Sequence, residues 1–413
     1  VTPLSLFFSI ITARVLGPAQ YGILAVMIAI QQVLAQTVGS FSLVTAKYVA
    51  AYRATDDQPA IAAFLRSIVR LMIQVGVVSV LVLSVASPFI RSFLHLTSAT
   101  TVVLVGILFA GTLGMEVTRG LLQGLHDFGR LALNQIAEAA VRLALGVAIL
   151  AAGLAINGAI IAYFLGVVAA ISLTVPLFRV MTREPGPRPP LGPIIAFSRM
   201  VIIVGVCNIA LTNADLILVK HYFPPTDAGI YAAVAAFGRL LYITSTVVWT
   251  TMFPTIAAIN AVKGNSARLL FINIGVLLFF AAGAVMVLTL FGEPLLRGLY
   301  GDAYAPGAGL LGLYGLSVLL ALPVNSINFY LMARSRTTFV PLYITGVCLQ
   351  IGLIVAFHSS LRQVILAMCA SNSAMLLSYT LLLGIPRLHA RLRPPYQSTA
   401  MAGNASSNGE EQQ

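Results

Sequence analysis

The chain of 413 residues is 59% hydrophobic and only 9% charged, whereas soluble globular domains carry about 25% charged residues. No water-soluble fold of this length covers so much apolar surface with so few charges, which excludes a cytosolic enzyme and makes lipid the solvent. The net charge is +12. The basic residues lie in small groups between apolar stretches, however, a pattern that indicates topology signals and no nucleic-acid partner.

Twelve apolar segments approach the length of about 20 residues that a helix needs to cross a bilayer. The first segment is short, as expected for a truncated N-terminal helix. Glycine and proline residues separate many of the segments, where the chain must turn. The predicted spans lie at residues 2–16, 22–44, 67–87, 98–119, 134–154, 157–178, 200–219, 229–252, 269–290, 308–331, 340–357 and 364–385.

The distribution of basic residues orients these spans. Of the 24 Lys and Arg residues, 17 fall in one set of alternate loops and five in the opposite set. The cytoplasmic side of a membrane protein retains the excess of Lys and Arg. We therefore expect both termini to lie in the cytoplasm.

The two halves of the sequence are similar to one another. An offset of 207 residues aligns Pro18 with Pro225 and Gly22 with Gly229, which favours an internal duplication. We predict an all-α, polytopic membrane protein in which about 12 transmembrane helices form two pseudo-symmetric six-helix bundles around a central cavity. The predicted parts are an N-terminal bundle at 1–181, a proline-rich cytoplasmic linker at 182–198, a C-terminal bundle at 199–386, and a polar, disordered cytoplasmic tail at 387–413.

Charged side chains within the spans are the first candidates for function, because a charge at membrane depth is costly unless it is paired or hydrated. Glu138 and Arg142 stand four residues apart and can meet on one helix face. They either neutralise one another, or Arg142 faces the cleft and offers its planar fork to a diphosphate while Glu138 fixes its position.

A second group lies in the seventh and eighth spans. Asn208, Thr212 and Asp215 share one helical face, as either a structural polar seam or an ion-coupling site built around a buried carboxylate. Arg239 lies near the middle of the eighth span and is the strongest candidate for binding an anionic headgroup. Its alternative role is a salt bridge to Asp215.

Three short stretches resemble polysaccharide-biosynthesis flippases, a family related to the multidrug and lipid-linked-oligosaccharide exporters. They are ARVLGPAQYG at Ala13–Gly22, DAGIY at Asp227–Tyr231 and YGDAYAP at Tyr300–Pro306. The resemblance implies two six-helix bundles around a cavity, and transfer of a polyprenyl-pyrophosphate-linked oligosaccharide from the cytoplasmic to the outer leaflet. Some members of the family have fourteen spans, whereas this sequence supports only twelve.

We therefore expect a bacterial inner-membrane flippase that works by alternating access and is coupled to H⁺ or Na⁺. Its expected partners are the lipid-linked oligosaccharide, membrane lipid, and glycosyltransferases or polymerases. Nothing resembles a nucleotide-binding loop, so we do not expect ATP to be the direct energy source. We expect no cofactor, and no enzyme activity because the longest outer loop has no room for a catalytic domain. Two alternatives remain. A multidrug exporter should have an acidic cleft, and a membrane glycosyltransferase or polymerase should have a larger outer loop than the one at 291–307.

Overall fold

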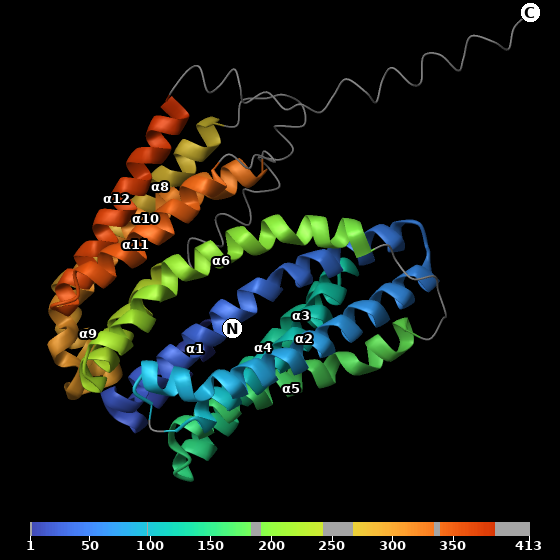
Figure 1. Cartoon of the computed structure of the whole chain (residues 1–413), viewed down its shortest axis with the longest axis horizontal. Coiled ribbons are helices and arrows are strands. Elements are labelled where there is room, and N and C mark those ends of the chain that lie inside the picture. The colour runs from blue at the N-terminus through green and yellow to red at the C-terminus, as the bar shows by residue number, and fades with distance from the viewer. Residues whose placement is uncertain (1, 97, 183–190, 243–266, 334–338, 385–413) are drawn as a thin grey trace, which may run out of the picture.

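The computed structural model describes the whole chain except residues 1, 97, 183–190, 243–266, 334–338 and 385–413. The described residues are almost entirely helical and contain no β-strand (Figure 1). The chain is helical from 225 to 242, where the described part of that helix ends. The other elements are α1 (Thr2–Ala54), α2 (Gln58–Phe93), α3 (Thr100–Gly124), α4 (Phe128–Ala151), α5 (Ala155–Met181), α6 (Leu191–Tyr222), α8 (Ala267–Leu290), α9 (Gly292–Tyr300), the 3₁₀ helix η1 (Asp302–Gly307), α10 (Ala308–Ala333), α11 (Val340–Ala356) and α12 (Leu361–Gly384).

The helices agree with the predicted spans. Within the described part of the chain, nine helices are long and apolar enough to cross a membrane, and α11 is a shorter apolar helix. The first two predicted spans both lie in α1, and the eighth, at 229–252, is described only as far as residue 242. The remaining spans each coincide with one helix, so the predicted fold class is confirmed.

A break at Gly17 divides α1 into two arms. Gly17 has φ 70° and ψ 171°, in the left-handed region that favours glycine because it has no Cβ. Pro18 follows and begins the second arm, where its fixed φ suits a first helical turn and its missing N–H costs no hydrogen bond. The predicted turn at Gly17-Pro18 is therefore a kink between two spans, without a separate loop.

The turns from α1 to α2 and from α3 to α4 share one construction. In each, a residue with positive φ, Asp56 or His126, precedes the aspartate that caps the next helix. The carboxylates of Asp57 and Asp127 accept hydrogen bonds of 2.9 and 3.0 Å from backbone N–H groups in the first turn. Such caps satisfy helical donors that would otherwise lack partners.

The hydrophobic core is shared at one end of the molecule and divided at the other. One cluster contains residues from both halves, among them Met27 and Tyr231. Two further clusters are each confined to one half, around Phe64 in the first and Tyr343 in the second. Figure 1 shows the corresponding shape: α1–α5 and α8–α12 converge near α9 and diverge toward the opposite end, and α6 packs against α1 and α11.

At the shared end, equivalent residues of the two halves meet. A Cβ on Gly22 would lie 2.8 Å from the backbone nitrogen of Gly229, and a Cβ on Gly229 would overlap the carbonyl oxygen of Pro18. These glycines occupy matching positions in the repeat. Contact between matching positions is what a two-fold axis through the interface produces, and only glycine permits so close a crossing.

Other contacts between the halves gather at the same end. The Tyr304 hydroxyl in η1 donates a hydrogen bond of 2.9 Å to the Ala13 carbonyl. The His221 ring stacks on Phe93 at 4.0 Å between centroids. The short helices α9 and η1, which the sequence analysis did not predict, occupy the loop at 291–307 and bring Tyr304 to this interface.

The predicted linker is partly wrong. Residues 191–198, expected to be extended, belong to α6, which begins at Leu191. Pro193 lies in the first turn of that helix, where proline is tolerated because the N–H that it lacks has no helical partner. Residues 183–190 and the predicted disordered tail at 387–413 lie outside the described residues.

Candidate functional site

A cavity lies beside the second half of the chain, where α6 faces α10, α12 and the helix at 225–242. Its volume is about 230 Å³, and Gln32 of α1 closes it from the first half. Arg239 is the one charged residue among the described residues that line the cavity. The other polar side chains in its wall are neutral amides and hydroxyls: Gln32, Asn208, Thr212, Asn213, Tyr242, Tyr314, Ser317 and Asn372.

Arg239 reaches this cavity with much of its hydrogen-bonding capacity unused. Its Nε and Nη2 atoms are buried and have no hydrogen-bond partner among the described residues. The expected alternative, a salt bridge to Asp215, does not form. Both residues belong to the described part of the chain, and no nitrogen of the Arg239 guanidinium lies within 4.0 Å of an Asp215 oxygen. A buried guanidinium without acceptors is costly, and an anion in the cavity would supply them.

Asp215 is fully buried behind the cavity wall. Its Oδ2 accepts hydrogen bonds from the hydroxyls of Tyr231 at 2.7 Å and Tyr314 at 3.1 Å, while Oδ1 has no partner among the described residues. Tyr314 also lines the cavity, so its hydroxyl links the buried carboxylate to the cavity wall.

Asn208 and Thr212 line the cavity itself, as their position on one helix face suggested. The Asn208 amide donates hydrogen bonds to the Tyr242 hydroxyl at 2.7 Å and to Asn325 Oδ1 at 3.0 Å. The Thr212 hydroxyl bonds to the Asn208 carbonyl at 3.1 Å. Neither residue forms a described hydrogen bond with Asp215, so the three predicted ion-coupling residues fall into two separate environments.

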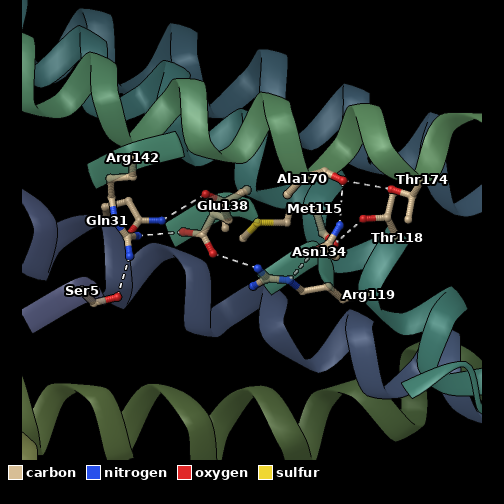
Figure 2. Close-up of polar contacts among 11 residues, drawn as sticks. Ser5, Gln31, Met115, Thr118, Arg119, Asn134, Glu138, Arg142, Ala170 and Thr174 are labelled. Atoms are coloured by element: carbon tan, nitrogen blue, oxygen red, sulfur yellow. Dashed lines mark hydrogen bonds and ion pairs between the residues drawn. The ribbon is translucent and has the colours of Figure 1, made fainter. Parts of the chain in front are cut away.

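In the first half, Glu138 lies between two arginines (Figure 2). Its carboxylate oxygens pair with Arg142 at 2.7 Å and with Arg119 at 2.8 Å. Arg142 also donates a hydrogen bond of 2.5 Å to the Ser5 hydroxyl and lies 4.7 Å from the centre of the Tyr163 ring. Glu138 therefore fixes both guanidinium groups, and the sequence prediction had identified only one of these pairs.

Arg119, which was not among the candidates from the sequence, completes this network. Its Nε donates a hydrogen bond of 3.1 Å to Asn134, whose own amide donates to the Ala170 carbonyl at 2.6 Å (Figure 2). The single carboxylate of Glu138 therefore serves two guanidinium groups.

Arg142 and Arg239 belong to different halves, Arg142 to α4 and Arg239 to the helix at 225–242. The Nε of Arg142 is buried without a hydrogen-bond partner among the described residues. Arg239 lines the cavity, however, and Arg142 does not. Each of the two predicted arginines thus has an unused donor, but one cavity does not join them.

Several lining residues were missed by the sequence analysis: Gln32, Asn213, Tyr242, Tyr314, Ser317 and Asn372. The sequence marks these residues only weakly as parts of a site, because hydroxyl and amide side chains also form ordinary contacts between membrane helices. Asn213 and Asn372 are nevertheless amides within apolar spans, which by itself marks them for attention.

Fold and site together define a multi-pass membrane protein with two helical halves and a cavity in which Arg239 is the one charged residue among the described lining residues. The chain belongs to the polysaccharide biosynthesis protein family, whose sequence model matches residues 1–260. No curated protein matches the chain in sequence.

Solved structures with this fold are transporters and flippases. The chain is similar to an inward-facing multidrug resistance MATE family transporter of the MOP superfamily, with 15% identity, 94% of each chain covered and a TM-score of 0.71. For the outward-facing form, the TM-score is 0.64 at 15% identity, over 94% of this chain and 93% of the other. The lipid II flippase MurJ in an inward closed conformation gives 0.70 at 13% identity, covering 92% of this chain and 85% of MurJ. These likenesses concern the fold.

Proposed function

We propose that this protein flips a polyprenyl-pyrophosphate-linked oligosaccharide from the cytoplasmic to the outer leaflet of a bacterial inner membrane, by alternating access. The observation that carries the proposal is the guanidinium of Arg239, which reaches a cavity lined by the second half and by Gln32 of α1, with two buried donors unused. A pyrophosphate presents several anionic oxygens, and guanidinium groups bind such oxygens through pairs of parallel hydrogen bonds.

The arrangement of the halves supports a state open toward the cytoplasm. The loops that the basic residues assign to the outer side gather at the end where the halves share a core, and the halves diverge at the opposite end (Figure 1). The higher TM-score to an inward-facing transporter than to its outward-facing form agrees with this interpretation. A headgroup would then enter from the cytoplasmic leaflet.

Arg142 is the second pyrophosphate ligand in this proposal, positioned by Glu138. Nη1 of Arg142 pairs with Glu138 and Nη2 donates to the Ser5 hydroxyl, whereas its buried Nε has no hydrogen-bond partner among the described residues. A cation held in place before the ligand arrives loses less conformational entropy on binding.

Asp215 is the coupling residue in this proposal. A carboxylate that is fully buried, with one oxygen unused, can exchange H⁺ or bind Na⁺. Its Tyr314 partner lines the cavity, so a change at Asp215 alters the wall against which the headgroup rests. Asn208 and Thr212 then act in that wall and are not direct ligands of the ion.

A multidrug exporter of organic cations fits the site less well. A cationic drug requires an acidic surface, and among the described residues the charged group that lines this cavity is an arginine. The nearest carboxylate, Asp215, is occupied by two tyrosine hydroxyls. The lining therefore favours an anionic substrate.

A flipping assay in liposomes tests the proposal. Protein is reconstituted with undecaprenyl pyrophosphate carrying a fluorescent N-acetylglucosamine, and flipping is measured by quenching from outside. Arg239→Gln should lower the initial rate at least 30-fold, because removing one partner of a buried charge pair costs about 2–5 kcal/mol. Arg130→Ala is the matched control, since its side chain is 63% exposed and lies outside the cavity. Unchanged flipping in Arg239→Gln would overturn the site assignment.

Coupling is tested in the same liposomes with a pH or Na⁺ gradient. Asp215→Asn retains the shape of the side chain but removes its charge, so the accelerating effect of the gradient should disappear while flipping without a gradient continues. A gradient effect that persists in Asp215→Asn would exclude Asp215 as the coupling residue.

A further inference from the structure

Two amides in the cavity wall have their oxygens free. The Asn213 amide nitrogen donates hydrogen bonds of 3.1 Å to the Ile209 carbonyl and to the Thr212 hydroxyl. The Asn372 amide nitrogen donates one of 3.1 Å to the Ser317 carbonyl. A backbone carbonyl can only accept, so these bonds fix which end of each amide is nitrogen.

The remaining oxygens need donors from elsewhere. The Oδ1 atoms of Asn213 and Asn372 are buried without a hydrogen-bond partner among the described residues, and the two side chains are 2% and 3% exposed. Buried polar atoms in proteins are nearly always paired. Both residues line the cavity, so a ligand there that presents hydrogen-bond donors can supply the missing partners.

The cavity thus combines two kinds of unused group. Arg239 offers donors and therefore requires an anionic or carbonyl acceptor, whereas Asn213 and Asn372 offer acceptors and require hydroxyl or N–H donors. A sugar attached to a pyrophosphate has both, in adjacent positions. A carboxylate near the two amide oxygens would instead place like partial charges together without a donor.

The rings and the space in the wall also suit a sugar. Tyr242 and Tyr314 line the cavity with their hydroxyls engaged by Asn208 and Asp215, so their orientations are fixed. Gly238 leaves room for Tyr314, since a Cβ there would overlap the tyrosine ring. Fixed, amphipathic rings present apolar faces beside polar groups, as a pyranose with its C–H and O–H groups requires.

We infer that Asn213 and Asn372 form a subsite for the first sugar of the glycan, next to the pyrophosphate, and that this subsite selects an uncharged sugar. The inference rests on the proposed function and extends it: Arg239 recognises the carrier, and the two amides recognise what the carrier bears. The hydroxyl groups of the sugar donate to the two Oδ1 atoms and so satisfy them.

Binding to purified protein in nanodiscs tests this inference with three probes: undecaprenyl pyrophosphate alone, the same carrier bearing one glucose, and the carrier bearing glucuronic acid. Undecaprenol, which has no pyrophosphate, is the reference lipid. The unmodified protein should bind the glucose-bearing carrier at least tenfold more tightly than the bare carrier, and the glucuronic acid form no more tightly than the bare carrier. Equal affinity for the bare and glucose-bearing carriers, or tighter binding of the glucuronic acid form, would overturn the subsite.

The double variant Asn213→Leu with Asn372→Leu should lose the preference for glucose and retain the affinity for the bare carrier. Asn328→Leu is the control, because Asn328 is a buried amide of the same half that does not line the cavity, and it should retain the preference. A preference that survives in the double variant would overturn the inference. The inference would also fail if the double variant kept its preference for glucose but its binding no longer depended on Na⁺. That result would assign the two amide oxygens to a cation.

The proposed function and the subsite fail in different ways. If no probe binds the unmodified protein more tightly than undecaprenol does, the proposed function fails and the subsite with it. If the bare carrier binds and Arg239→Gln abolishes that binding, while the sugar makes no difference, only the subsite fails.

Discussion

The two halves of this protein differ in how their buried arginines are paired. In the first half, Glu138 pairs with both Arg119 and Arg142. In the second half, Arg239 lies beside a cavity with two donors unused and no described carboxylate within ion-pair distance. The first arrangement stabilises the folded structure and leaves only the Nε of Arg142 for a ligand, whereas the second leaves two donors of one guanidinium at the expense of stability.

Loss of Glu138 should have the largest effect on stability. Glu138→Gln would leave Arg119 and Arg142 buried near one another without the carboxylate that joins them. Breaking a buried pair by removing one partner costs about 3–5 kcal/mol, so the thermal midpoint in detergent should fall sharply. If the midpoint did not change, the network in the first half would not be structural.

Loss of Arg239 should act in the opposite direction on stability. A buried polar group without a partner costs about 1–3 kcal/mol, and more when it is charged, so Arg239→Gln should raise the thermal midpoint while it lowers the rate of flipping. Arg142→Gln, by contrast, should lower the midpoint. Destabilisation of the same size by both variants would remove the difference between the halves.

Gly238→Ala tests how the wall beside Arg239 is built. The added Cβ would overlap the Tyr314 ring, and forced rearrangement in a packed core costs about 1–3 kcal/mol. Tyr314 would move away from Asp215, and transport should fall more than stability. Gly275→Ala is the control because a Cβ at Gly275 meets nothing within 4 Å. Equal transport by the two variants would contradict the packing described for Tyr314.

The smallest effect is expected outside the cavity, at the ion pair between Arg297 and Glu293. Their nitrogen and oxygen atoms are 3.0 Å apart, but both side chains are 55% exposed. Solvent-exposed pairs contribute about 0.2–1 kcal/mol. Arg297→Ala should therefore change the thermal midpoint and the transport rate only slightly, and a large loss of transport would indicate a role for this outer loop that the central cavity does not explain.

The spans could be predicted well from the sequence because one property, a run of about 20 apolar residues, is enough to identify a membrane helix. The sequence also identified Arg239, since a charge in such a segment stands out. The linker was predicted less well because proline suits both an extended chain and a first helical turn, and Pro193 lies in the latter.

The composition of the site was harder to predict, because the spacing of residues on one helix does not show which neighbouring helix each side chain meets. Asp215 shares a helix face with Asn208 and Thr212, yet it bonds to Tyr231 and Tyr314 from two other helices. Likewise, the link from Glu138 to Arg119 depends on the packing of α3 against α4. Asn213 and Asn372 are 159 positions apart in sequence, and only the fold brings both to one cavity.

The most direct test of the central claim is the affinity of the purified protein in nanodiscs for undecaprenyl pyrophosphate and for undecaprenol, measured with and without Arg239→Gln. If Arg239 is the ligand of the pyrophosphate, the unmodified protein should prefer the pyrophosphate at least 30-fold, and the variant should bind both lipids with similar affinity. A pyrophosphate preference that is unchanged in Arg239→Gln would contradict the account.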